Sequence, residues 1–538
     1  MLIASGDQRR SANVACWPAQ KALEDDARRA FAALGWKIVR GSPERQSDDE
    51  PHGFINSQAY GREVFQGIHP DAPLVVAEAV WQYSQHVLSG LTRHRGPILL
   101  LANWSGQWPG LVGVLNLRGS LTKAGTKYSM LWGEDFSSPA FMRKLESWCG
   151  TGGIDHDHSH VRALRPTDLP AASREIGEKL AADLGRHPAI MGVFDEGCMG
   201  MYNAIIPDRL LHSCHVFKER QSQSGLFAAM QQVADKDADQ VRDWCQQRGM
   251  KFKTGPDEAT NLTDRQIREQ CKMYIAAVRL ADTWGMDLLG IQYQLGLTDT
   301  CAASDLVEGL LNCSERPPVV AIAGPRAGQV IRDGRPITHF NEVDECAGLD
   351  GLITDRVWTA LGMPPDNTLH DLRWSDKDRS GTTSDEVWVF EISGAVPPSH
   401  LEGGYAGAVS ERQPPMYFRM GGGGIKGVSR PGHVVWSRIY VQPDPTGVER
   451  LHMDIGLCKA ISLPDAETQR RWESTTSQWP IMHAVLDGVT RDQMMAKHQS
   501  NHVQVVYATD ATSARRGLEA KAAMAMALGI AVNLCGAA

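Results

Sequence analysis

Short apolar runs alternate with amphipathic segments along the first two thirds of the chain. Continuous apolar runs, typical of buried strands, occupy residues 97–101, 128–132, 189–194, 288–291 and 319–323. Apolar positions three or four residues apart, typical of helices with one buried face, occupy residues 169–184, 271–278, 304–311 and 349–361. Such an alternation of strands and helices predicts parallel sheets covered by helices.

The pattern changes after Gly362, which together with Pro364 predicts the end of the preceding helix. Apolar runs at 387–392, 434–441 and 451–457 then follow one another without long helices between them. In the last run apolar and other residues alternate, which favours an antiparallel or barrel-like sheet. A strand at 503–507, a helix at 514–528 and a strand at 530–534 complete the expected elements.

We therefore expect an α/β protein of three domains. Two Rossmann-like α/β domains with parallel sheets are expected over residues 1–165 and 166–362, and a C-terminal β-barrel-like α+β domain over residues 363–538. A length of 538 residues agrees with this division, because domains average about 150 residues.

Composition and charge narrow the class of protein. Hydrophobic residues make up 42% of the chain and charged residues 22%, which predicts that it folds throughout. The formal charge of −8 disfavours nucleic acids and anionic membranes as partners. The 11 cysteines are dispersed without a CxxC pair, as expected of reduced thiols. Because no apolar segment reaches the roughly 20 residues that span a bilayer, we expect a soluble, cytoplasmic protein.

Two clusters of polar residues have both a functional and a structural interpretation. Residues 155–160 contain three histidines and two aspartates, which could bind a metal ion, but polar loops of this kind usually lie at the surface. Asp195 and Glu196 end an apolar run, where open α/β sheets bind ligands, yet a simple strand-to-helix turn explains them equally well. Phosphate-binding loops, HExxH and GxSxG motifs are absent from the sequence.

Asn501 and three titratable residues, Glu345, Asp371 and His502, stand at the ends of predicted elements. Asn501 and His502 stand just before an apolar run, Asp371 ends a short extended segment, and Glu345 falls in the first turn of a predicted helix. Each also has an ordinary structural interpretation, as a core histidine, a strand-end cap and an acidic helix N-terminus. Whether they converge depends on the fold.

Taken in order along the chain, these segments resemble the L-fucose isomerase family, whose relatives include the arabinose isomerases. The similarity is carried by Gln292, the segment from Glu345 to Gly351, Asp371 with Arg373, Tyr405 after two glycines, Trp479-Pro480 and Asn501-His502. The chain departs from the family where Cys346 and Ala347 replace an Asn-Asp pair, and where Val503 replaces a glycine.

The resemblance implies two α/β domains, a barrel-like C-terminal domain and a metal-dependent isomerase. A fucose- or arabinose-type free sugar would interconvert between aldose and ketose through a cis-enediol. Glu345 and Asp371 would bind Mn²⁺, or Mg²⁺ or another divalent ion, and carry protons, with His502 as the third ligand. Residues implied in sugar binding are Gln292, Tyr405, Trp479 and Asn501. The family also implies a homo-oligomer, possibly a hexamer.

Two alternatives stay open at this point. Arg412, Arg419, Lys426 and Arg430 surround a glycine run, and could bind a sulfonated or phosphorylated sugar such as sulfoquinovose, although a solvated loop also accounts for them. A non-catalytic sugar-binding or sensor protein could use the same α/β domains without turnover.

Overall fold

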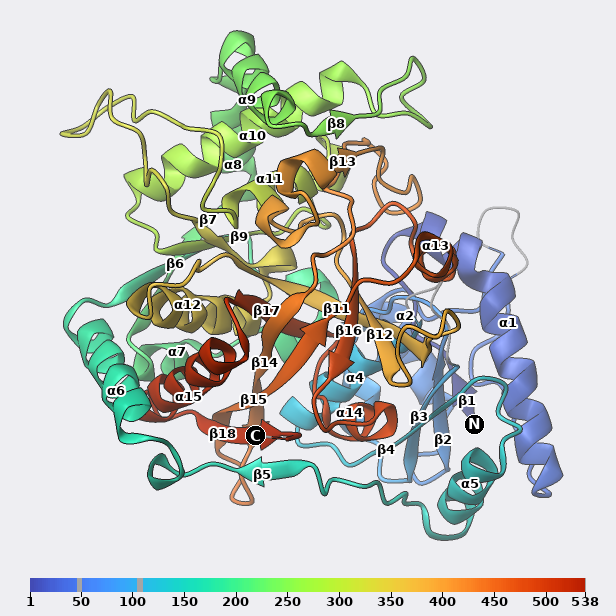
Figure 1. Cartoon of the computed structure of the whole chain (residues 1–538). Coiled ribbons are helices and arrows are strands. Elements are labelled where there is room, and N and C mark those ends of the chain that lie inside the picture. The colour runs from blue at the N-terminus through green and yellow to red at the C-terminus, as the bar shows by residue number, and fades with distance from the viewer. Residues whose placement is uncertain (46–50, 104–109, 538) are drawn as a thin grey trace.

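The computed structural model describes residues 1–45, 51–103 and 110–537. In this part of the chain the fold is mixed α/β, with two parallel sheets and a closed six-stranded antiparallel barrel. Figure 1 shows the blue N-terminal sheet and the green and yellow second sheet on different sides of the orange and red barrel. The α/β class, the parallel sheets and the barrel expected from the sequence are confirmed, whereas the three domain boundaries stay predictions.

The N-terminal sheet is parallel, in the order β1-β2-β3-β4. Its strands are β1 (Leu2–Ile3), β2 (Leu74–Glu78), β3 (Ile98–Asn103) and β4 (Ser129–Gly133). Its helices are α1 (Arg10–Ala33), α2 (Gln58–Gln66), α3 (Gln85–Leu91), α4 (Gly110–Lys123) and α5 (Pro139–Thr151). Almost every residue of α4 is buried, because the helix lies between the strand β3 and the barrel strands.

The second sheet is also parallel, in the order β10-β9-β6-β7. Its strands are β6 (Ala189–Phe194), β7 (Val216–Gln221), β9 (Leu288–Ile291) and β10 (Thr338–His339). The helices of this region are α6 (Ala171–Arg186), α7 (Asp208–Ser213), α8 (Gln223–Gln231), α9 (Asp235–Gln247), α10 (Asp264–Thr283), α11 (Asp305–Leu311) and α12 (Glu345–Ala360). Short 3₁₀ turns follow the strands at η2 (Cys198–Gly200), η3 (Tyr202–Ala204), η4 (Leu297–Asp299) and η5 (Asn341–Val343).

The barrel closes because β14 pairs with both β17 and β15. Around it run β14 (Gly432–Pro443), β17 (His502–Ala508), β11 (Asn367–Lys377), β12 (Glu386–Glu391), β16 (Ile481–Leu486) and β15 (Glu449–Ala460). The connections carry η6 (Pro398–His400), η7 (Gly404–Gly407), α13 (Asp465–Glu473) and α14 (Arg491–Lys497). A small parallel pairing of β8 (Lys251–Phe252) with β13 (Val409–Ser410) ties the barrel connections to the second region.

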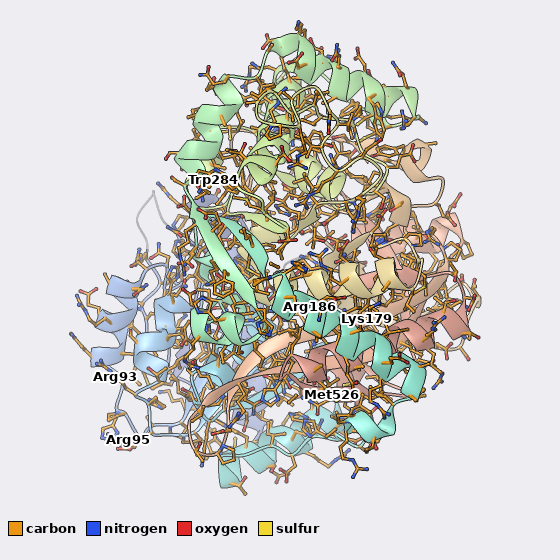
Figure 2. The ribbon with its side chains drawn as sticks, turned by 90° about the vertical axis from the view of Figure 1, so that its left-hand side faces the viewer. Arg93, Arg95, Lys179, Arg186, Trp284 and Met526 are labelled. Atoms are coloured by element: carbon orange, nitrogen blue, oxygen red, sulfur yellow. The ribbon has the colours of Figure 1, made fainter. Side chains whose placement is uncertain are left out.

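The last strand, β18 (Ala531–Cys535), extends the barrel sheet beside β15, and β5 (Val161–Ala163) pairs with its other edge. Helix α15 (Ala511–Ala527) packs on α6 so closely that a Cβ atom at Gly177 would lie 2.4 Å from the backbone nitrogen of Met524. Figure 2 labels Lys179 and Arg186, which are exposed side chains of the same helix α6. The contact between the two helices therefore depends on a small residue.

Most predicted elements match the structure within a few residues, and two of them, 189–194 and 288–291, coincide with β6 and β9. The predicted buried strand at 319–323 is wrong. That segment forms only an isolated bridge between Val320 and Val330, and Ile322 is 72% exposed. Val319 and Ala321 are buried in the core, whereas Val320 and Ile322 are exposed, so part of the segment is buried without forming a strand.

All 11 cysteines lie in the described residues and are free. Across the ranges that the structure covers, every helix is too short or too polar to cross a membrane.

Candidate active site

A pocket lies where the carboxyl ends of β9 and β10 meet the barrel and the N-terminal region. It is lined by Arg9, Trp81, Val112, Met199, Gln294, Glu342, Asp371, Arg373, Ser393, Tyr417, Phe418 and Trp479. It encloses about 430 Å³ of empty space, including the part open to solvent. Ligands of α/β sheets bind at the carboxyl ends of strands, so the position fits a ligand site.

The barrel brings Asp371 and His502 together. Asp371 on β11 lies directly opposite His502 on the antiparallel neighbour β17, and such pairs point to the same face of a sheet. The Nε2 atom of His502 lies 3.4 Å from an oxygen of Asp371. Asn501 donates a hydrogen bond of 3.3 Å to the same oxygen. Burial alone would lower the pKa of His502, but its bonds to Asp344 and Asp371 raise it to about 9.

Glu342 completes the group from the second region. It follows β10 in the turn η5, and its carboxylate lies 3.8 Å from Nε2 of His502. Its φ angle is 58° and that of Val343 is 56°, so two residues without glycine's freedom adopt left-handed backbone there. Gln292 supports the turn, donating a hydrogen bond of 3.1 Å to the carbonyl of Glu342. Burial raises the pKa of Glu342 to about 7, against the opposing attraction of His502.

Asp344 stands behind His502, on the side away from the pocket. One of its oxygens accepts hydrogen bonds from Nδ1 of His502, at 2.6 Å, and from Arg438, at 2.5 Å. The other caps α12 by accepting from the backbone N–H of Ala347. All contacts of this carboxylate are therefore with hydrogen-bond donors.

Aromatic rings and buried polar atoms form the walls of the pocket. Tyr417 and Trp479 stack with centroids 6.4 Å apart, and Phe418 and Trp81 also face the space. Three buried polar atoms of the lining have no hydrogen-bond partner in the described structure: Nε1 of Trp81, the hydroxyl of Tyr417 and Oε1 of Gln294. Buried polar groups are nearly always satisfied, so these atoms indicate a polar ligand.

Two arginines line the pocket, and each is paired with its own carboxylate. Arg9 makes two hydrogen bonds to Asp7, at 2.9 and 2.7 Å, and lies over the ring of Tyr417. Arg373 lies 3.3 Å from Glu391. At Arg373 the register between β11 and β12 shifts by one residue, a bulge of the kind found beside active sites. Of the carboxylates in the lining, Glu342 and Asp371 are the two that face His502, which lies beside the pocket.

The three groups carry donor atoms of the kind that bind a divalent cation. Carboxylate oxygens and imidazole nitrogens suit Mn²⁺ and Mg²⁺ better than they suit thiophilic metals. The two carboxylates lie 3.4 and 3.8 Å from Nε2 of His502. Over the described ranges, no group of three or more His, Cys, Asp or Glu side chains is placed, as it stands, so that it could hold a metal ion, and binding would require these side chains to move closer together.

The structure brings some of the predicted site residues together and places others elsewhere. Asp371, His502, Asn501 and Trp479 come together, and Trp479 donates to Gln413 at 2.8 Å while its ring lines the pocket. Gln292 lies behind Glu342, and Gln294 lines the pocket in its place.

Glu345, which the resemblance implies as a metal ligand and proton carrier, does not join this group in the structure. Its oxygens contact Lys218 at 2.8 Å and the backbone N–H of Ile206 at 2.7 Å. The first turn of α12 directs it toward β7, whereas Glu342, three residues earlier, takes the position beside His502. The sequence did offer one signal for Glu342, because it is a second glutamate just before Asp344, the N-cap of α12. No sequence pattern, however, predicts the left-handed turn that directs its side chain.

Tyr405 is likewise outside the pocket. Its hydroxyl donates to the carbonyl of Glu315 at 2.6 Å, and its ring packs edge-on against Trp244. Tyr417 lines the pocket instead. Both tyrosines neighbour glycine- or proline-rich turns, so the sequence alone did not separate them.

The other candidate clusters have structural roles. His156 and His158 bond to different backbone carbonyls, of Met130 and Ala496, and do not share a site. Asp195 caps α8 at Gln223, and Glu196 pairs with Lys218.

The cationic residues near the glycine run are also engaged elsewhere. Arg419 pairs with Asp299 and Lys426 with Glu411, while Arg412 and Arg430 donate to backbone carbonyls.

Comparison with known proteins adds no relative, because neither a protein-family model nor a curated protein matches the chain.

Proposed function

We propose that the protein is a metal-dependent aldose–ketose isomerase that acts on a free monosaccharide, as its resemblance to the L-fucose isomerase family implies. The observation that carries the proposal is the convergence of Glu342, Asp371 and His502 in an aromatic pocket with unpaired polar atoms. Aromatic rings pack on the C–H faces of sugars, and unpaired buried donors and acceptors suit hydroxyl groups.

The charge balance supports an uncharged sugar. Arg9 and Arg373 are neutralised by Asp7 and Glu391, so neither is a spare partner for a sulfonate or phosphate. With a divalent ion and a neutral imidazole, the two carboxylates bring the centre to zero net charge. An anionic sugar would add uncompensated charge in a buried site, which is costly.

The residues can supply the two proton movements of the reaction. In an aldose-to-ketose conversion the proton on C2 moves to C1, and the hydroxyl proton of O2 moves to O1. Glu342, whose pKa is about 7, takes the carbon-bound proton and returns it to the neighbouring carbon. Asp371 moves the proton between the two oxygens. A bound divalent ion would act as a Lewis acid that offsets the negative charge developing on those oxygens.

The test uses metal-stripped protein, a panel of neutral aldoses and added Mn²⁺, with ketose formation followed by NMR. The expected result is turnover of at least one aldose that depends on the metal. Binding of a sugar without conversion of any would support the sensor alternative and overturn the isomerase. Turnover of a sulfonated or phosphorylated sugar in preference to neutral ones would overturn the substrate class.

A further inference from the structure

We propose that Asp344 is a positioning residue that fixes the orientation and tautomer of His502, so that Nε2 is the atom offered to the metal ion. The inference rests on the proposed function, because it concerns the same metal centre. Asp344 itself contacts neither the pocket nor a ligand, and acts through His502.

The contacts of Asp344 join three separate elements. It caps the N-terminus of α12 and accepts hydrogen bonds from Arg438 on β14 and from His502 on β17. The side chains of Asp344, Arg438 and His502 are each at most 2% exposed to solvent. Water therefore does not compete for these bonds, and the imidazole ring is held from behind.

The hydrogen-bond chemistry determines which nitrogen is free. Both oxygens of Asp344 accept hydrogen bonds from groups that can only donate, the guanidinium of Arg438 and the backbone N–H of Ala347, so the carboxylate faces His502 as an acceptor. Nδ1 of His502 must then carry a proton, which leaves the lone pair of the neutral ring on Nε2. Nε2 is the atom that faces Glu342 and Asp371. A carboxylate behind a ligand histidine also raises its basicity, and loss of such a partner weakens metal binding about 10- to 100-fold.

The same helix offers a matched control. Asp350, six residues further along α12, pairs with Lys521 at 2.5 Å and accepts a hydrogen bond from Ser437, the neighbour of Arg438 on β14. This pair is equally buried and joins α12 to the barrel strand, but it has no contact with His502. Removing the Asp350–Lys521 pair therefore weakens the packing of α12 on the barrel without changing the contacts of the His502 imidazole.

The decisive experiment measures Mn²⁺ binding by calorimetry in metal-stripped protein. The double variant Asp344→Ala with Arg438→Met removes both members of the pair, so no unpaired charge stays buried. Its control is Asp350→Ala with Lys521→Met. We expect the first to raise the Kd for Mn²⁺ at least about 10-fold and the second to leave it within about 3-fold of wild type. Asp344→Asn, which preserves volume, serves as a second test variant and should also weaken binding.

A spectroscopic signature separates positioning from simple loss of stability. Electron spin echo spectra of bound Mn²⁺ should show coupling to an imidazole nitrogen in wild type and in the control. The coupling should be lost or altered in the Asp344 variants at saturating Mn²⁺. Unchanged Kd and coupling in both Asp344 variants would overturn the inference alone, whereas a wild-type protein that binds no Mn²⁺ would overturn the proposed metal centre and this inference with it.

Discussion

Asp371 and His502 occupy directly opposed positions on adjacent barrel strands, with Nε2 of the imidazole 3.4 Å from the carboxylate. The register of a closed barrel sets this separation, since a slip by one residue would turn both side chains to the other face of the sheet. The barrel therefore positions both side chains of this pair, whereas Glu342 lies outside the barrel and is positioned by the turn η5.

Replacing Glu342 should have a much larger effect on turnover than replacing Glu345. Glu342→Gln keeps the shape of the side chain but removes its proton-carrying group, so we expect kcat to fall about 10²- to 10⁴-fold. The measurement is the rate of ketose formation with saturating Mn²⁺.

Glu345→Gln provides the comparison for that experiment. Its carboxylate faces Lys218 and Ile206, so the expected loss is in the free energy of unfolding, by about 1–3 kcal/mol. A variant at Glu345 that is folded yet inactive, beside an active Glu342→Gln, would reinstate the assignment predicted from sequence.

Asp371 should be required for metal binding as well as for turnover. Asp371→Asn removes one of two proposed carboxylate ligands, and we expect calorimetric Mn²⁺ binding to weaken more than about 10-fold. Asp376→Asn on the same strand is the control, because that side chain pairs with Arg379 and Arg470 instead. Equal Mn²⁺ affinity in the two variants would argue against Asp371 as a ligand.

The two tyrosines should respond to loss of their hydroxyl groups in opposite ways. Tyr417 lines the pocket, and its buried hydroxyl has no hydrogen-bond partner in the described structure, so Tyr417→Phe should lower kcat/KM about 3- to 10-fold and leave the melting temperature unchanged. The hydroxyl of Tyr405 bonds to Glu315, so Tyr405→Phe should destabilise the fold by about 1 kcal/mol without altering kcat/KM. Kinetics and thermal melts of both proteins distinguish these outcomes, and the reverse pattern would return Tyr405 to the site.

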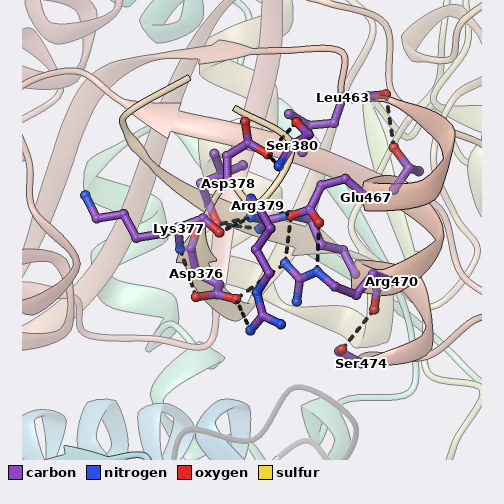
Figure 3. A network of polar contacts seen from close by, with 12 residues as sticks. Asp376, Lys377, Asp378, Arg379, Ser380, Leu463, Glu467, Arg470 and Ser474 are labelled. Atoms are coloured by element: carbon purple, nitrogen blue, oxygen red, sulfur yellow. Dashed lines mark hydrogen bonds and ion pairs between the residues drawn. The ribbon is translucent and has the colours of Figure 1, made fainter. Parts of the chain in front are cut away.

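A network of charged residues beside α13 should give a specific acid dependence of stability. Figure 3 shows Glu467 near Arg470, with Asp376 at the end of β11 and Arg379 in the turn that follows it. The hydrogen bonds from Arg470, and then from Arg471, lower the pKa of Glu467 to about 2 although burial opposes the shift. Because the unfolded pKa is higher, near 4.3, the stabilisation is complete above about pH 4.5 and is lost as the pH falls toward 2.

Glu467→Gln tests this dependence. Its melting temperature should lie below that of wild type at pH 6, and the difference should shrink steadily between pH 4.5 and pH 2. Exposed Glu473→Gln on the same helix is the control and should show no such trend. A constant difference across the range would exclude the network as its source.

The sequence predicted the fold better than the site, because the periodicity of apolar residues indicates which residues are buried but not where a given polar side chain points. Alternating residues of β15 and the apolar runs of β6 and β9 sufficed to locate these strands. The pattern at 319–323 misled, since Val319 and Ala321 are buried there without forming a strand and Ile322 is exposed. Asp371 and His502 were singled out through the resemblance to a family, and the pairing of β11 with β17 that brings them together was not predicted from the sequence.

Glu342 and Tyr417 were not predictable for a different reason. The aim of Glu342 depends on two left-handed residues in η5, and steric strain of that kind is maintained by tertiary contacts such as the bond from Gln292. Tyr417 enters the pocket from a long connection between barrel strands, whose path no local pattern determines.

The order of elements along the chain also governs when the pocket can exist during synthesis. Asp344 and His502 are 158 residues apart, and Asp371 and Asn501 are 130 residues apart. A nascent polypeptide that has folded both parallel sheets still lacks the barrel strands β11 and β17, so Glu342 is in place without the two other proposed ligands. Pairings of such long range are formed slowly, and we therefore expect metal binding to be among the last properties acquired when the protein is made or refolded.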